Sequence, residues 1–184
     1  YKQKRRTKAT VAKEKGLEPL ANQLLEFKKD NIEILAAPFV NEEKGVGNVE
    51  EAIAGAKDIL AELFADDAAV RDKIRKLSWR EGRITTSVKD ADKDEKKVFE
   101  MYYEYEEPVK HIVPHRTLAI NRGEKEDILK VSIHVPIDPV LQIMEKQWIP
   151  SITSSPSVHS VREAIEDGYK RLIQPSIERE LRNE

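Results

Sequence analysis

The stretch NVEEAIAGAKDILAEL, residues 48–63, is the clearest helical signal in this sequence. Asn48 followed three residues later by Glu51 resembles a capping box, in which two side chains satisfy backbone N–H groups at a helix start. Apolar residues then recur at the spacing of a single helix face, which predicts an amphipathic α-helix. They are Ala52, Ala56, Ile59, Leu60 and Leu63.

Helix signals continue on both sides of this stretch. A helix is expected from about Thr7 to Gly16, because glycine commonly follows a helix end, and Pro19 suits the start of a second helix. Asp66 or Asp67 is expected to cap the helix that follows residues 48–63. The β-branched segments 83–89 and 128–135 predict short strands.

The second half of the chain predicts further helices around these strands. Residues 92–95 resemble another capping box, so an aromatic helix over 99–105 is expected. Residues 115–123 predict a short helix that ends at Gly123, and Asp138 and Pro139 predict the start of another. The last long helix is expected to begin at Ser155 and Pro156, with a kink or break at Pro175 because proline lacks an N–H donor.

The predicted fold is therefore mainly α, one multi-helical domain over residues 1–184 with a small β element. Within it we expect a basic and acidic helical part over 1–90, helices with a short strand over 91–150, and a long terminal helix over 151–184. Trp79 and Trp148 are expected to be core anchors. The aromatic segment 99–105 could stack nucleic-acid bases, but aromatics at helical spacing are more typical of a core.

Composition restricts the class of protein. The 184 residues carry a net charge of -2, with 39% hydrophobic and 36% charged residues and no cysteine, so disulfides and thiolate metal sites are excluded. No apolar run approaches the roughly 18 residues of a membrane span, and the basic start has no apolar segment behind it. We therefore expect a cytoplasmic protein without membrane contact. The first residue is Tyr1 rather than Met, which suggests a fragment.

Enzyme motifs are not found. The sequence has no Gly-rich phosphate loop, no G-x-S-x-G and no H-E-x-x-H. His111 and His115 have a spacing that serves metals on one helix, but Pro114 between them predicts a helix start there. A metal-dependent hydrolase is a remote alternative. We expect no enzyme activity, no cofactor, no metal and no small-molecule substrate.

Clusters of basic residues are the candidate binding groups. The first eight residues, YKQKRRTK, contain five basic residues and no acid. Further basic residues recur in the segment 75–83 and on both sides of the helix expected at 115–123. Any of them could neutralise phosphates or simply form a solvated, salt-bridged face. The candidates for nucleic-acid binding are Lys4, Arg5, Arg6, Lys8, Arg75, Lys76, Arg80, Arg83, Arg116 and Arg122.

Several long motifs resemble the bacterial Tex family of transcription accessory proteins, in the same order. They are YKQKRRTKATVAKEKGLEPLA (1–21), AAPFVNEEKGV (36–46), AIAGAKDILAE (52–62), PHRTLAINRGE (114–124) and PSIERELRNE (175–184). The resemblance implies a larger protein with a helix-turn-helix-containing region, an RNase H-like domain, helix-hairpin-helix elements and an OB-fold RNA-binding domain. This chain would be the later part of the N-terminal helical region, with a helix-turn-helix-like arrangement, leading to a missing domain.

The resemblance also implies a function in transcription. We expect a non-enzymatic scaffold with accessory, sequence-independent contacts to RNA or DNA in the parent protein, made by Lys and Arg on phosphates. RNA polymerase or other transcription proteins are further expected partners. The alternative is a protein–protein interaction scaffold that docks the missing domains or RNA polymerase and binds no nucleic acid itself.

Overall fold

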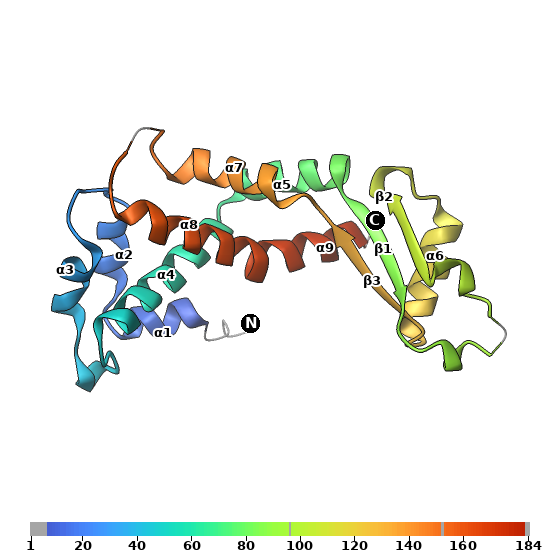
Figure 1. Cartoon of the computed structure of the whole chain (residues 1–184), viewed down its shortest axis with the longest axis horizontal. Coiled ribbons are helices and arrows are strands. Elements are labelled where there is room, and N and C mark those ends of the chain that lie inside the picture. The colour runs from blue at the N-terminus through green and yellow to red at the C-terminus, as the bar shows by residue number, and fades with distance from the viewer. Residues whose placement is uncertain (1–6, 96, 152, 183–184) are drawn as a thin grey trace, which may run out of the picture. The chain divides into compact units, whose positions relative to one another are not determined.

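The described part of the chain, residues 7–95, 97–151 and 153–182 of a computed structural model, is mainly α-helical with one small antiparallel sheet (Figure 1). This confirms the predicted fold class. Contacts group the chain into two units, Tyr1–Asp72 with Leu141–Ser176, and Lys73–Val140 with Ile177–Glu184. Helices α5 (Ala68–Glu81), α7 (Ile137–Trp148) and α9 (Gln174–Arg182) each contribute residues to both units.

In the first unit, α4 (Val49–Ala65) is the helix on which the others pack. The helices α1 (Lys8–Glu14), α2 (Glu18–Leu24), α3 (Ile32–Ala36) and α8 (Ser157–Asp167) all contact it. Gly16 follows α1 with a φ of 79°, as predicted for a glycine after a helix end. The turn between α1 and α2 is three residues long, and the helix-turn-helix-like arrangement stays a prediction.

The start of α4 is a variant of the predicted capping box. The Asn48 side chain accepts a hydrogen bond of 2.8 Å from the Glu51 N–H. The Glu51 carboxylate accepts from the N–H of Gly47 at 2.7 Å, one residue earlier than in the standard box. Four predicted core positions of α4 are buried, but Leu63 is 44% exposed, because the buried face continues through Phe64 instead.

The last long helix accommodates Pro175 without ending. Between α8 and α9 lies a π-helical segment, η6 (Gly168–Ile173), in which the Gln174 N–H donates to the carbonyl of Tyr169, five residues back. Proline cannot donate to the carbonyl four residues before it, and its ring crowds that carbonyl. The wider π turn directly before Pro175 replaces the predicted kink or break.

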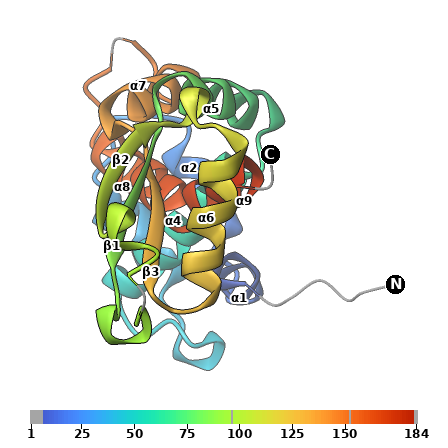
Figure 2. The same cartoon turned by 90° about the vertical axis from the view of Figure 1, so that its right-hand side faces the viewer.

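The second unit is built on a three-stranded antiparallel sheet of order β2-β1-β3. Its strands are β1 (Arg83–Val88), β2 (Glu104–Pro108) and β3 (Leu129–His134), so both predicted strands are confirmed. In β3 the residues alternate between buried and exposed, and α6 (Pro114–Lys125) packs against the buried side (Figure 2). The other elements are the short 3₁₀ turns η1 (Ala37–Phe39), η2 (Glu42–Lys44), η3 (Ala91–Lys93), η4 (Glu100–Tyr102) and η5 (Val109–His111).

Two local predictions are wrong in this unit. The expected aromatic helix over 99–105 is a 3₁₀ turn followed by β2, and the Asp94 carboxylate takes backbone N–H groups of Val98 and Phe99 at 2.9 Å each. Gly123 does not end α6 but lies inside it. A Cβ at Gly123 would be 2.4 Å from Cδ1 of Leu129, so glycine permits close packing of α6 on β3.

Candidate interaction surfaces

The candidate cations are distributed unevenly over the described residues. Lys4, Arg5 and Arg6 lie outside the described part of the chain. Lys8 is the first residue of α1 in the first unit. The other six belong to the second unit, where Arg75, Lys76 and Arg80 lie on α5, Arg83 on β1, and Arg116 and Arg122 on α6.

Two of these arginines connect different elements of the second unit. Nε of Arg75 lies 2.6 Å from Oε2 of Glu180, which joins α5 to α9. Arg83 pairs with Glu106 on the neighbouring strand β2. Each guanidinium therefore meets a carboxylate of the same unit, and its charge is at least partly neutralised before any phosphate approaches.

Arg116 belongs to a part-buried polar network. Its Nη1 donates to Oε1 of Glu107 at 2.7 Å, and the Tyr105 hydroxyl donates to the other carboxylate oxygen at 2.6 Å. The Glu107 side chain is only 11% exposed. Burial, together with the hydrogen bond to Glu107, raises the pKa of Tyr105 above its ordinary value. A buried carboxylate needs such partners, so Arg116 has a structural role.

Four candidate cations, Lys8, Lys76, Arg80 and Arg122, are exposed. Arg80 is 65% exposed, with Glu81 beside it at 3.8 Å, and Arg122 is 71% exposed, with Glu126, the residue directly after α6, at 3.4 Å. Exposed pairs of this kind contribute little, so both guanidinium groups can exchange a carboxylate for a phosphate.

Lys8 lies in the field of an acid on α4. Burial raises the pKa of Asp58, and Lys8 is the strongest of the positive charges that oppose this rise. The Thr7 side chain accepts from the Thr10 N–H at 3.1 Å and caps α1 next to Lys8. The first turn of α1 is therefore ordered, and it presents one cation to solvent.

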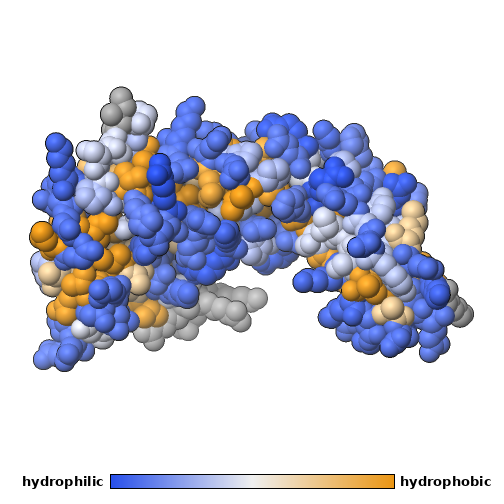
Figure 3. Space-filling view, viewed as in Figure 1, coloured by the Kyte–Doolittle hydropathy of each residue, from blue (hydrophilic) through white to orange (hydrophobic). Residues whose placement is uncertain are grey.

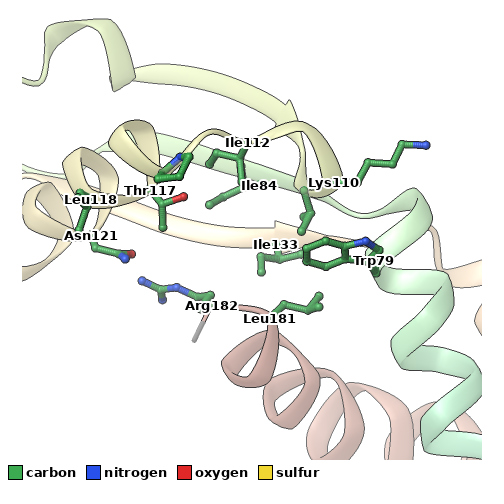
Figure 4. Close-up of a pocket in the computed structure, with 12 residues that line it drawn as sticks. Trp79, Ile84, Lys110, Ile112, Thr117, Leu118, Asn121, Ile133, Leu181 and Arg182 are labelled. Carbon is green, nitrogen blue, oxygen red and sulfur yellow. The ribbon is translucent and has the colours of Figure 1, made fainter. Parts of the chain in front are cut away.

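Sequence reasoning missed an apolar groove in the second unit, with a volume of about 470 Å³. It lies between α6, the end of α5, the end of α9 and the apolar side of the sheet (Figure 4). Six large apolar residues line it: Trp79, Ile84, Ile112, Leu118, Ile133 and Leu181. Trp79 is 43% exposed, so the prediction that it is a core anchor is wrong.

Trp148, the other predicted anchor, packs in the first unit against Phe64, with ring centroids 4.8 Å apart. Apolar surface also gathers over α2 and α3 of that unit (Figure 3), where Ile34 is 70% exposed.

The two histidines of the hydrolase alternative lie on different elements, His111 in η5 and His115 in α6. Within the described ranges, no three His, Cys, Asp or Glu side chains come together as a metal site. None of the described helices is both long and apolar enough to cross a membrane.

These features define a helical module with a small sheet, in which ion pairs join neighbouring elements and an apolar groove stays open. The chain belongs to the Tex family, because the family model described as Tex central region-like matches residues 28–184. The recognition made from the sequence motifs is thereby confirmed.

Relatives cover most of this chain. The uncharacterized protein YdcI of Bacillus subtilis is 54% identical over 187 residues, covering 100% of this chain and 26% of that protein. The transcriptional accessory protein Tex of Neisseria gonorrhoeae is 37% identical, covering 81% of this chain and 20% of that protein. The human S1 RNA-binding domain-containing protein 1 is 30% identical, covering 96% of this chain and 19% of that protein. The chain thus spans about a quarter or less of the length of these relatives.

Proposed function

We propose that this chain is a non-enzymatic scaffold segment of a cytoplasmic Tex-family protein, with accessory, sequence-independent contacts to RNA or DNA. In this proposal residues 1–184 act as one domain of a longer protein. The observation that carries it is that some candidate cations pair with acids on other elements, whereas others are exposed. Arg75, Arg83 and Arg116 each pair with an acid on another element, so their charges are partly neutralised, and the part-buried Arg116 pair also joins α6 to β2.

The accessory contacts are assigned to the cations that are not committed in this way. Lys8, Arg80 and Arg122 are exposed and would meet phosphate oxygens without reading bases. Lys4, Arg5, Arg6 and Lys76 belong to the same proposal. The names of two relatives support it, since one is a transcriptional accessory protein and the other carries an S1 RNA-binding domain.

A salt titration tests this assignment. Binding of labelled single-stranded RNA and of duplex DNA to the chain is measured by fluorescence anisotropy over a range of salt concentrations. Each phosphate contact on a single strand contributes about -0.7 to the log–log slope. Replacing Lys8, Arg80 and Arg122 together by Gln should therefore reduce the slope by about 2 units.

The matched control replaces three other exposed cations, Lys28, Lys89 and Lys170, by Gln, which changes the net charge equally. An equal reduction of the slope in both triple variants would reduce the effect to bulk charge and reject the assignment. Absence of binding at low salt would remove the nucleic-acid part of the proposal and leave the scaffold.

The second candidate function is a protein–protein interaction scaffold without nucleic-acid binding of its own. The observation that favours it is the apolar groove, where Trp79 and Leu118 are 43% and 71% exposed. A contiguous exposed apolar surface on a polar protein marks an interaction site. The missing domains of the longer protein or RNA polymerase would be its partners.

A further inference from the structure

We propose that the groove of the second unit docks a protein segment that carries large apolar side chains and a neighbouring carboxylate. This inference rests on the scaffold part of the proposed function, and it adds the chemistry of one partner. The groove has a deep apolar floor, since Ile84 and Ile133 are only 8% and 5% exposed. Its edges are open, because Trp79 and Leu118 remain accessible.

The open edges come from distant parts of the sequence. The Trp79 side chain lies at one end of the groove, and Leu118 on α6 lies at the opposite end (Figure 4). Apolar side chains inserted between them would cover both edges and reach the isoleucines of the sheet. This is the way in which an amphipathic helix anchors itself in a hydrophobic groove.

The charge of the lining selects the occupant. The described residues that line the groove include two cations, Lys110 and Arg182, and no acid. Arg182 already pairs with Glu124, whereas Lys110 is exposed and makes no ion pair with any described residue. A partner carboxylate near Lys110 would complete a pair across the interface, so the complementary segment is acidic as well as apolar.

A protein segment fits these walls better than a nucleic acid does. Apart from Trp79, the apolar lining is aliphatic, so it offers a single aromatic surface for base stacking. Lys110 is the one lining cation without a carboxylate partner among the described residues, which is little for a phosphate backbone. Branched aliphatic walls do match the shape of Leu, Ile or Phe side chains.

The test uses Trp79 as a reporter. The chain has two tryptophans, so the Trp148→Phe variant leaves Trp79 as the single one. The probe is a synthetic helical peptide with two Leu residues four positions apart, flanked by Glu. Its first control has Lys in place of each Glu, and its second has Ser in place of each Leu. We expect a saturable blue shift of Trp79 emission with the acidic Leu peptide and weak or no shift with the controls.

Matched variants locate the binding. Leu118→Glu should weaken binding of the acidic peptide about tenfold or more, because it puts a repelling charge at the groove. Met101→Glu makes the same kind of change at a residue that is 63% exposed and outside the groove, and it should have no effect. Lys110→Glu should weaken binding of the acidic peptide and strengthen that of the Lys control peptide.

Two outcomes would overturn the proposal. One is the absence of any saturable shift with the acidic peptide while circular dichroism shows the protein folded. The other is tighter binding at Trp79 by a short single-stranded RNA that Leu118→Glu abolishes, which would make the groove a nucleic-acid site. Neither outcome depends on Lys8, Arg80 or Arg122, so the nucleic-acid part of the proposed function is judged separately by the salt titration.

Discussion

Arg116 on α6 and Glu107 on β2 form an ion pair of 2.7 Å in which the carboxylate is almost fully buried. The Arg116 guanidinium offsets the cost of burying the Glu107 charge, while the Tyr105 hydroxyl donates a hydrogen bond to the second carboxylate oxygen. The pair holds β2 against α6, and the expected contact of Arg116 with nucleic acid stays a prediction.

Replacing Arg116 by Ala should destabilise the protein by about 1–3 kcal/mol, since it leaves a buried carboxylate without one of its hydrogen-bond donors. The measurement is the free energy of unfolding from urea titration. Arg122→Ala on the same helix is the control, and because Arg122 is 71% exposed its loss should cost at most about 0.5 kcal/mol. Equal costs for the two variants would contradict the structural role of Arg116.

Gly123→Ala should destabilise the protein, although alanine is favoured over glycine within a helix by about 1 kcal/mol. The added Cβ would lie 2.4 Å from Cδ1 of Leu129 and 3.2 Å from Cδ1 of Phe99, and overpacking of this kind costs about 1–3 kcal/mol. Asn121→Ala, an exposed position on the same helix, should be neutral or slightly stabilising. Thermal unfolding of both variants checks the sign, and a stabilising Gly123→Ala would show that α6 does not approach β3 closely.

Acid should weaken the segment around Asp94. Burial tends to raise the pKa of this carboxyl, but hydrogen bonds from the Phe99 N–H, the Tyr103 hydroxyl and the Val98 N–H lower it below its ordinary value. A lowered pKa in the folded state means that the stabilisation is complete above the unfolded pKa of about 3.9 and is lost as the pH falls through the folded value.

The urea midpoint of the wild type should therefore fall more steeply below about pH 4 than that of Asp94→Asn, which has no charge to lose there. Asp92→Asn, at an exposed position in η3, is the control and should keep the steep decline of the wild type. Identical pH profiles for the wild type and Asp94→Asn would contradict the lowered pKa.

Asn48→Ala should cost about 1 kcal/mol, because the Glu51 N–H at the start of α4 loses its acceptor. The effect should appear in global unfolding, since α4 contacts four other helices of the first unit. Asn22→Ala makes the same substitution at an exposed position inside α2, where alanine is the better helix former, so it should not destabilise. A cost at Asn22 as large as at Asn48 would rule out capping as the cause.

Local chemistry explains which parts of the fold could be predicted. The Asn48 cap, the glycine after α1 and the alternating pattern of β3 all depend on residues within a few positions of one another. The prediction of an aromatic helix over 99–105 was wrong because the pattern from Asp92 to Glu95 suggested a helix cap at the wrong residue. Asp94 is the acceptor instead, and it stabilises a turn rather than an α-helix.

The candidate interaction surfaces were harder to predict from the sequence than the fold. The sequence identifies cations, but only the fold shows that Glu180 and Glu106 come from distant segments to neutralise Arg75 and Arg83. The groove has the same origin, because Trp79 and Leu118 belong to different helices. The family could be recognised from the sequence because the resemblance extends over long runs of residues and does not require knowledge of their contacts.

The π segment before Pro175 has a consequence for how the terminal helix can vary. Its large buried residues within the first unit are spaced four apart, at Val161, Ile165, Tyr169 and Ile173. In a regular α-helix, each step of four residues turns about 40° away from the starting face. The wider turn at Gly168–Ile173 takes back part of this rotation. Deleting one residue there would turn Ile173 by about 100° relative to Val161 and Ile165, so we expect this segment to tolerate substitution better than a change of length.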